Sequence, residues 1–455
     1  RPFYISTIED MIMKTIKIIF LSIFIVLLLV PVVTMNIQSG YASTITNAML
    51  PELDLKNFSR EDVDKYIAER IGFHDEAITK YLTLYDRLFG VLEHPTYTYG
   101  KEGYTFFRPG SDWVDTTFID AFCQYLREIQ DYCENRGVPF LYCVNPAKST
   151  VYNEYLPEGY LYENRFLSYL YECLEKNGVC YISNVELLTE KAQNEQVYNQ
   201  KYDAGHWNDL GEFYATNHML EAISKSFPSV RPWTQSDFEI STKTETYLPL
   251  SQFVIDEKVP QYTYRNSENV EDISALYESI NLDPSHSAFA CFRLKDASDL
   301  PRVMFFHGSY YNRNRDFYKG AFAETYAIHN YENLLNFEYY FNIFQPDYVV
   351  LETVEYATGR GYFDLTTMME KDLNPRLCEV IDEPHCICSL QEVGAVTEAN
   401  HAIKVITFEM EQAYSFGYLE TKDGVLDLII DETKISCTVQ LDSVSLEGAV
   451  IHLYP

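Results

Sequence analysis

The chain of 455 residues has a net charge of −32, and 15% of its residues are aromatic, including 38 tyrosines. A chain of this length exceeds one hydrophobic core, so we expect two domains, and the aromatic content excludes general disorder. The net charge excludes nucleic acid as a partner, because no basic patch offsets the repulsion of phosphate. Neutral glycans remain candidate partners.

The N-terminal segment over residues 18–35 carries no charged side chain and follows two lysines. It is long enough to cross a bilayer with a hydrocarbon core of about 30 Å. The lysines before it and the acidic residues after it place the rest of the chain outside the cytoplasm, by the positive-inside rule. We therefore predict a leader over residues 1–50 with a membrane anchor over 14–37. The alternative is a secretory signal peptide cleaved near Ala42, which also exports the main body.

The ten cysteines are scattered along the chain and form no C-x-x-C pair. This spacing argues against a zinc site, so we expect neither a metal nor another cofactor. Cys123, Cys133 and Cys143 fall within a predicted helix and a predicted strand, where a cysteine usually packs as a small apolar residue. A disulfide between Cys173 and Cys180 is an alternative for an exported chain.

Helical and strand patterns alternate after the leader. Residues 59–84 are expected to form a helix that begins with a capping pattern at Ser59 and Asp62, and residues 104–107 a short strand. The next segments predict helices over 117–135, 163–176 and 210–225, with apolar strands over 138–144 and 179–182. Apolar strands between amphipathic helices predict an α/β fold with a mostly parallel sheet covered on both faces.

Residues 228–300 interrupt this alternation with β-prone pieces over 238–242 and 261–265, and we interpret them as a β-rich insertion. The α/β pattern resumes with a strand over 303–306, a helix over 320–344 and a last strand over 347–352. These segments predict one catalytic domain over residues 51–375. Residues 376–455 read as a small β-sandwich-like module, with strands over 402–410, 425–430, 437–441 and 449–453.

Two short motifs carry the chemistry of this chain. The first is Asp203-Ala204-Gly205-His206-Trp207-Asn208, and the second is Phe306-His307-Gly308-Ser309-Tyr310 directly after an apolar strand. A serine hydroxyl needs a base within hydrogen-bond reach, and that base needs a carboxylate that fixes its tautomer. Ligands bind at the carboxyl ends of strands in such sheets. We therefore predict a triad of Ser309, His206 and Asp203.

The backbone around the serine supplies further candidates. Gly308 permits a sharp turn after the strand, so that neighbouring N–H groups such as that of Tyr310 can face an incoming carbonyl. The side-chain amide of Asn312 is another candidate oxyanion donor. Arg313 and Arg315 are the best candidates for holding an anionic sugar. The alternative for this segment is a plain polar loop.

Other residues near the two motifs have a structural alternative beside the functional one. Trp207 either stacks a sugar ring or packs under its loop. Lys148 lies at a strand end, where it either reaches the cleft or is solvated. Glu355 follows the last strand and is a candidate lining residue of the same cleft. His307 is expected to form a structural hydrogen bond and not to act as a second base.

The chain resembles the SGNH-hydrolase-like proteins of the alginate O-acetyltransferase (AlgX/AlgJ-like, DHHW-type) group. The resemblance covers residues 66–356 and rests on six motifs in the family's order. They are Tyr66–Phe73, Gly100–Tyr104, Asn145–Lys148 running on to Pro157, the Asp-His-Trp motif, the Gly-Ser-Tyr motif and Pro346–Val350. By this resemblance Asp203 and His206 are the acid and base of a triad, and Ser309 is its nucleophile.

Three departures from the family pattern concern the substrate. This chain has D-x-x-H-W where close relatives commonly have D-x-H-W, and His307-Gly308-Ser309 where the family prefers G-D-S. It has Glu355-Tyr356 at the end of the last strand, where the family often has Glu-Arg. The tyrosine removes a cation that would otherwise be available to a substrate or an oxyanion.

The resemblance implies an extracytoplasmic protein that acts on bacterial exopolysaccharides. We expect an O-acetyltransferase that moves an acetyl group through Ser309 onto a sugar hydroxyl of a polysaccharide. A membrane-bound O-acyltransferase is the expected partner that donates the acetyl group, and the C-terminal module would bind carbohydrate. The alternatives are an acetylesterase with the same triad, in which water is the acceptor, and a non-catalytic glycan-binding scaffold.

Overall fold

The structure is a computed structural model that describes residues 2–41, 43, 49–53, 56, 58–89, 97–108, 114–160, 162–247, 254–280, 289–371, 373, 384–440 and 444–455. Ala42, at the alternative cleavage site, and Cys378 lie outside the described residues. The chain divides into two compact units: a first unit of Arg1–Pro109, Gln200–Ala204 and Thr244–Glu257, and a second unit of Gly110–Asn199, Gly205–Lys243 and Lys258–Pro455. The domain boundaries predicted at residues 50 and 375 stay a prediction.

The first unit begins with a long apolar helix, α1 (Pro2–Val33). Its segment Met13–Val33 has a mean hydropathy of 3.0 and is long and apolar enough to cross a membrane, as a signal sequence would also be. The helix predicted over 59–84 is two helices, α2 (Arg60–Arg70) and α3 (His74–Phe89), because Phe73 turns the backbone with a φ of 59°. The predicted capping box at Ser59 is confirmed. Strands β1 (Tyr97–Tyr99) and β2 (Thr105–Phe107) form an antiparallel pair.

A seven-stranded sheet forms the centre of the second unit, in the order β4-β3-β11-β9-β10-β8-β7. Strands β4, β3, β11, β9 and β10 are parallel, whereas β8 is antiparallel to both of its neighbours, so the predicted mostly parallel sheet is confirmed. The bounds are β3 Phe140–Asn145, β4 Tyr181–Ser183, β7 Val270–Asp272, β8 Phe289–Leu294, β9 Arg302–His307, β10 Glu324–His329 and β11 Tyr348–Val354.

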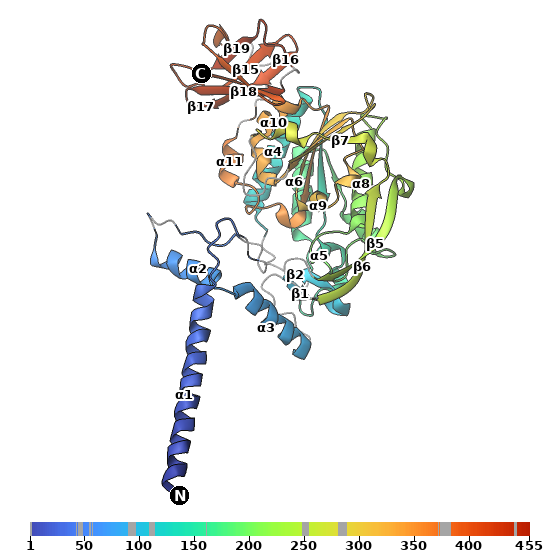
Figure 1. Ribbon diagram of the computed structural model, residues 1–455. Coiled ribbons are helices and arrows are strands. Elements are labelled where there is room, and N and C mark those ends of the chain that lie inside the picture. The colour runs from blue at the N-terminus through green and yellow to red at the C-terminus, as the bar shows by residue number, and fades with distance from the viewer. Residues whose placement is uncertain are drawn as a thin grey trace. The chain divides into compact units, whose positions relative to one another are not determined.

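Helices cover the sheet, and Figure 1 shows α4 and α6 on one face and α8 on the other. Strand β11 is buried along its whole length, which explains its apolar sequence. The helices of this unit are α4 Thr116–Glu134, α5 Lys148–Val151, α6 Arg165–Asn177, α7 Val185–Ala192, α8 Asp209–Ser224, α9 Ser309–Asn312, α10 Phe337–Phe344 and α11 Leu365–Glu370.

Of two further predicted segments, one differs from the structure and one agrees with it. The helix predicted over 320–344 is wrong for residues 324–329, which form β10 between β9 and β8, because buried pairing on both sides overrides a helical pattern. Only the later part is helical, as α10. The β-rich content predicted for 228–300 is present: β5 (Phe238–Tyr247) pairs with β6 (Val254–Tyr264), while β7 and β8 extend the main sheet.

The C-terminal segment forms two four-stranded antiparallel sheets, β12-β19-β15-β16 and β13-β14-β18-β17, as the sandwich-like prediction expected. Their facing side chains, such as Ile406, Leu419 and Ile451, form one apolar core. The strand predicted over 425–430 is divided between the two sheets. The bounds are β12 Cys386–Ser389, β13 Val396–Asn400, β14 Ile403–Glu409, β15 Phe416–Thr421, β16 Gly424–Asp427, β17 Ile429–Asp431, β18 Lys434–Gln440 and β19 Val450–Tyr454.

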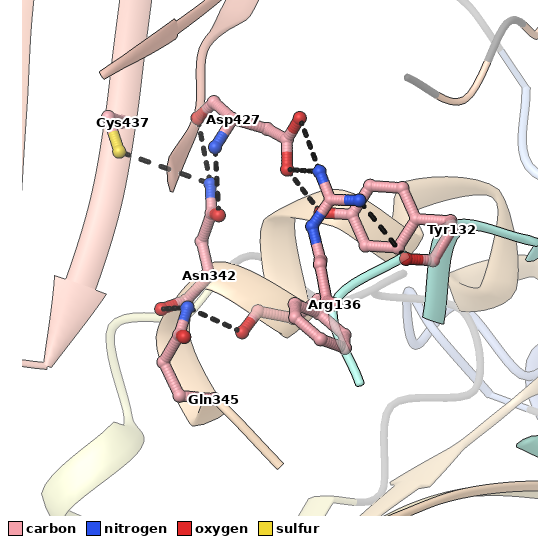
Figure 2. A network of polar contacts seen from close by, with 7 residues as sticks. Tyr132, Arg136, Asn342, Gln345, Asp427 and Cys437 are labelled. Carbon is pink, nitrogen blue, oxygen red and sulfur yellow. Dashed lines mark hydrogen bonds and ion pairs between the residues drawn. The ribbon is translucent and has the colours of Figure 1, made fainter. Parts of the chain in front are cut away.

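A buried charge joins this C-terminal segment to the helices of the α/β part, as Figure 2 shows. The carboxylate of Asp427, at the end of β16, accepts from the Tyr132 hydroxyl and lies 3.0 Å from the Arg136 guanidinium. The backbone of Asp427 exchanges two hydrogen bonds with the side chain of Asn342 on α10, of 2.8 Å and 3.1 Å. Burial raises the pKa of Asp427, and Arg136 opposes this shift. The junction is therefore specific and depends on both charges.

The cysteines that the structure describes are all free thiols. The alternative of a disulfide between Cys173 and Cys180 is therefore wrong, and the two lie on α6 and beyond its end, one buried and one exposed. Cys123, Cys133 and Cys143 are buried, which confirms their predicted role in packing.

Candidate active site

The candidate nucleophile lies at the carboxyl end of a central strand. Gly308 follows β9, and Ser309 is the first residue of the short helix α9. Ser309 is exposed, whereas its neighbours Tyr310 and Tyr311 are buried. The turn therefore presents one hydroxyl to solvent at the sheet edge where ligands bind in parallel α/β folds.

Gly308 is required by space and not by backbone conformation. Its φ of −101° is available to any residue. A Cβ atom at this position would overlap the ring and hydroxyl of Tyr331, which begins the 3-10 turn η7 (Tyr331–Asn336) after β10. The tyrosine therefore fixes the path of the chain immediately before Ser309.

The candidate base meets the serine directly. The Nε2 atom of His206 lies 2.8 Å from the Oγ atom of Ser309. This is the geometry in which the hydroxyl donates to a neutral imidazole. The His206 side chain is partly buried. The structure thus brings together two of the three residues predicted for the triad.

Two hydrogen bonds hold the histidine loop against the serine turn. The Trp207 indole N–H donates to the Tyr310 carbonyl at 3.2 Å, and the Tyr310 hydroxyl donates to the Gly205 carbonyl at 2.5 Å. The Trp207 ring also packs edge-on against Tyr310. Trp207 is 1% exposed, so its sugar-stacking role is wrong and the packing alternative is confirmed.

The loop continues into α8 through a side-chain cap. The Asn208 side chain accepts from the N–H groups of Leu210 and Gly211, at 3.0 Å and 3.1 Å. An asparagine at this position stabilises the start of a helix because it satisfies N–H groups that have no partner within the helix. The cap, two residues after His206, therefore fixes where α8 begins.

Asp203 belongs to the first unit, whereas His206 and Ser309 belong to the second. Its side chain is buried, and its backbone is left-handed with a φ of 67°. Burial, with the charge of Asp203 as a second cause, raises the pKa of Tyr97 to about 12. The role of Asp203 in the triad stays a prediction.

A carboxylate that the sequence analysis missed lies beneath the nucleophile turn. Glu352, on β11, is 0% exposed. Its carboxylate accepts from the Gly308 N–H at 2.5 Å, from the Asn145 amide at 2.7 Å and from the Tyr331 hydroxyl at 3.4 Å. Burial raises the pKa of Glu352 to about 7, although these donors and His206 lower it. A lone acid inside an apolar strand was the available signal.

This carboxylate ends a chain of hydrogen bonds that crosses the sheet. The Asn184 amide, after β4, donates to the Asn145 carbonyl oxygen at 2.7 Å. The Asn184 side chain meets His218 through its oxygen: the Nδ1 atom of His218 lies 2.8 Å from the Oδ1 atom of Asn184. Asn145 ends β3 and Asn184 follows β4, so the chain connects the carboxyl ends of four adjacent strands.

Glu355 and Lys148 have structural surroundings. The Glu355 carboxylate accepts from the Ala147 N–H at 2.6 Å and from the Thr150 hydroxyl, so it holds the start of α5. Burial raises the pKa of Glu355 to about 7. Lys148 is 1% exposed, so the alternative of a solvated lysine is wrong. The Pro146 carbonyl beside it accepts from Tyr310 at 3.4 Å, which places this segment against the serine turn.

His307 and the loop after Ser309 divide into buried and exposed parts. The His307 ring is buried and donates from Nδ1 to the Gly308 carbonyl at 2.9 Å, as the structural prediction expected. Burial lowers the pKa of His307 to about 3, so it is neutral. Arg313 is exposed, and Arg315 donates to the Asn312 side-chain oxygen at 3.2 Å. That bond leaves the Asn312 NH₂ group directed away from Arg315.

Tyr356 is a further residue beside the serine turn. Its side chain is 40% exposed, and its ring centroid lies 6.3 Å from that of Tyr310. It stands at the position where the family pattern often has an arginine. An exposed aromatic ring can stack on a sugar, because the ring faces of both are apolar.

The second unit is thus an α/β body that presents an exposed serine, beside a histidine, at the carboxyl end of a parallel strand. Among solved structures the chain is similar to PatB1 of Bacillus cereus in a structure with a sulfonyl adduct, with 14% identity and a TM-score of 0.46, over 57% of this chain and 94% of that chain. It is also similar to the O-acetyltransferase domain of Pseudomonas putida AlgJ, with 17% identity and a TM-score of 0.42, over 61% and 98% of the two chains. A third similar structure is AlgX of Pseudomonas aeruginosa, with 12% identity and a TM-score of 0.39, over 79% of this chain and 87% of that chain. No protein-family model and no curated protein matches the chain.

Proposed function

We propose that the protein is an extracytoplasmic O-acetyltransferase that moves an acetyl group through Ser309 onto a hydroxyl of a polysaccharide. The observation that carries this proposal is the 2.8 Å separation between His206 Nε2 and the exposed Ser309 Oγ. A hydroxyl so placed loses its proton to the imidazole as it attacks a carbonyl carbon.

The reaction would proceed in two acyl transfers. In the first, Ser309 Oγ attacks the carbonyl of an acetyl ester, His206 takes the hydroxyl proton, and His206 then returns this proton to the leaving alcohol. In the second, a sugar hydroxyl gives its proton to His206 and attacks the acetyl-serine ester. The bond between the acetyl carbon and Ser309 Oγ breaks, and His206 returns the proton to this oxygen. Asp203 is proposed to orient His206 and to stabilise its imidazolium, as the sequence motif predicts.

The oxyanion of each tetrahedral intermediate needs hydrogen-bond donors. The Gly308 N–H donates to Glu352, so it does not face an incoming carbonyl in this arrangement, and Gly308 is a poor candidate for this role. The Asn312 NH₂ group lies one helical turn after Ser309 on α9, and the Tyr310 N–H follows the serine. These two groups are the proposed oxyanion donors.

The surroundings favour a neutral glycan as the acceptor. The chain carries a net charge of −32, and Tyr356 offers an exposed aromatic surface beside the serine turn. Arg313 and Arg315 remain candidates for an anionic sugar. Helix α1 would hold the protein at the membrane, where a membrane-bound O-acyltransferase is the proposed source of acetyl groups. The C-terminal sandwich is proposed to bind carbohydrate.

The proposal is tested with the detergent-solubilised full chain, p-nitrophenyl acetate as donor and a neutral oligosaccharide as acceptor. We expect acetylated oligosaccharide by mass spectrometry, and its loss in Ser309→Ala and His206→Ala. Ser226→Ala, which changes an exposed serine in the turn after α8, is the matched control. Release of acetate that is independent of the oligosaccharide would assign the acetylesterase alternative. Absence of both products would assign the scaffold.

A further inference from the structure

Glu352 is a buried acid that touches the nucleophile turn, and the proposed reaction does not use it. We propose that Glu352 is a positioning residue: as a carboxylate, it holds the Gly308 N–H and thereby places the Ser309 hydroxyl on His206. This inference rests on the proposed function and deepens it, because it names what fixes the nucleophile.

The donors around Glu352 demand an acceptor at both of its oxygens. One oxygen accepts from the Gly308 N–H and the Tyr331 hydroxyl, and the other accepts from the Asn145 NH₂ group. A carboxylate is an acceptor at both oxygens, whereas a glutamine is an acceptor at only one. Glutamine at this position would place its NH₂ group against the NH₂ group of Asn145 or against the Gly308 N–H. Two buried donors without an acceptor are costly.

The hydrogen bonds that cross the sheet all run toward this carboxylate. The Asn184 NH₂ group donates to Asn145, and the Asn145 NH₂ group donates to Glu352. His218, at the outer end, meets the carbonyl oxygen of Asn184, so its Nδ1–H is the donor there. Aligned hydrogen bonds polarise one another, and here each one stabilises a negative charge at Glu352. The amide directions in this chain thus match an ionised acid at Glu352.

The turn before Ser309 is held from two directions. Glu352 holds the Gly308 N–H, and the Tyr331 ring fills the space that a side chain at 308 would need. Tyr331 itself donates to Glu352. A displacement of the turn by about 1 Å is enough to lower a rate by about 100-fold. Loss of the Glu352 anchor is thus expected to slow the chemistry more than to weaken binding.

The decisive experiment exchanges the acid and the amide of a neighbouring pair, so that the carboxylate moves from Glu352 on β11 to position 145 on β3. Glu352→Gln is expected to lower kcat for acetyl transfer by about 10- to 100-fold with little change in KM. Asn145→Asp, which sets two carboxylates face to face, is expected to be slow as well. The double variant E352Q/N145D restores a donor opposite an acceptor at each contact, and we expect it to recover most of the lost kcat.

A matched control separates positioning from general destabilisation. Glu338→Gln changes another buried acid, on α10, whose carboxylate pairs with Lys371. It is expected to lower the unfolding midpoint and to leave kcat of the folded protein unchanged. A double variant that stays as slow as E352Q would overturn the proposal.

Asn145→Ala is the substitute test if E352Q does not fold. It removes one of the donors to Glu352 and does not place two NH₂ groups against each other. It is expected to lower kcat, and an unchanged kcat would contradict the proposal.

A second readout does not depend on acetyl transfer. In the full chain labelled with ¹⁵N-glycine, the Gly308 amide proton is expected to resonate downfield and to exchange slowly, because it is bound to a carboxylate. In E352Q we expect this resonance to move upfield. No acetyl transfer by the wild-type chain would overturn the proposed function alone. An unmoved Gly308 resonance together with an unchanged rate in E352Q would overturn the role of Glu352 alone.

Discussion

The Nε2 atom of His206 and the Oγ atom of Ser309 lie 2.8 Å apart, although 103 residues separate them in the chain. The contact is supported from both sides, since Trp207 donates to the carbonyl of Tyr310 and Tyr310 donates to the carbonyl of Gly205. His206 and Ser309 are thus each followed in the sequence by a buried aromatic residue that is bonded to the other motif.

The indole of Trp207 is expected to keep His206 within hydrogen-bond distance of Ser309. Trp207→Phe removes the N–H donor and leaves the Tyr310 carbonyl without it, which should lower kcat by about tenfold and the free energy of unfolding by about 1–3 kcal/mol. Trp233→Phe is the matched control, because the Trp233 indole donates to the Phe317 carbonyl at 2.7 Å. The two variants should lose similar stability, and equal loss of kcat in both would contradict a specific role for Trp207.

Substitution of Gly308 should disturb the turn through a clash with Tyr331. Gly308→Ala is expected to lower both the unfolding midpoint and kcat, because a Cβ atom overlaps the tyrosine ring. The second substitution Tyr331→Ala makes room and should recover part of the stability of Gly308→Ala. Gly359→Ala is the control, since nothing lies near its added Cβ atom. Thermal unfolding that is the same for Gly308→Ala and the wild type would refute the clash.

The neutral state of His307 should make the protein sensitive to acid. Its folded-state pKa of about 3 lies below the ordinary value, because of burial first, with His329 and Arg315 also opposing its charge. The unfolded chain therefore binds a proton that the folded chain does not, between about pH 6.5 and pH 3. The stability that neutral His307 contributes is present above about pH 6.5 and is lost as the pH falls toward 3.

His307→Asn keeps a donor for the Gly308 carbonyl and removes this titration. Urea unfolding of the wild type at about pH 7.5 and about pH 4.5 should show a larger loss of free energy on acidification than the same measurement on the variant. Parallel losses in the two proteins would show that other groups account for the acid sensitivity.

The junction of the C-terminal segment should depend on its charge pair. Arg136→Met leaves the Asp427 carboxylate buried without its cation, and we expect a loss of about 3–5 kcal/mol in the free energy of unfolding. Asp427→Asn in the same chain should recover much of this loss. Arg293→Met breaks a half-exposed pair with Glu324 and should cost less than about 1 kcal/mol. Similar losses for Arg136→Met and Arg293→Met would contradict the importance of burial.

The sequence predicted the parts of the fold and site whose signals are local. The parallel strands β3, β4, β9 and β11 were found because each is an apolar segment between helical patterns, and Ser309 was found because its motif follows such a strand. Strand β10 was missed because it lies within a longer segment whose pattern predicts a helix. Its pairing with β9 and β8 makes it a strand, and the local sequence Glu-Thr-Tyr-Ala-Ile-His does not reveal this pairing. Its identity is decided by tertiary contacts.

Glu352 was missed for the same physical reason. Its role depends on donors that come from separate segments, namely Asn145 at the end of β3, Gly308 after β9 and Tyr331 after β10. The exclusion of Trp207 from sugar binding also depends on burial between two motifs, which neither motif alone determines. The residue types near the site were predictable, whereas the groups that hold them in place were not.

The most direct test of the central claim is a search for the acetyl-enzyme. The full chain is incubated briefly with p-nitrophenyl acetate, quenched in acid and digested, and the acetylated peptide is sequenced by mass spectrometry before and after a chase with oligosaccharide. We predict acetyl on Ser309, its transfer to the oligosaccharide during the chase, and a large reduction of labelling in His206→Ala. Labelling that is absent from Ser309, or that persists in Ser309→Ala with unchanged transfer, would contradict acyl transfer through this serine.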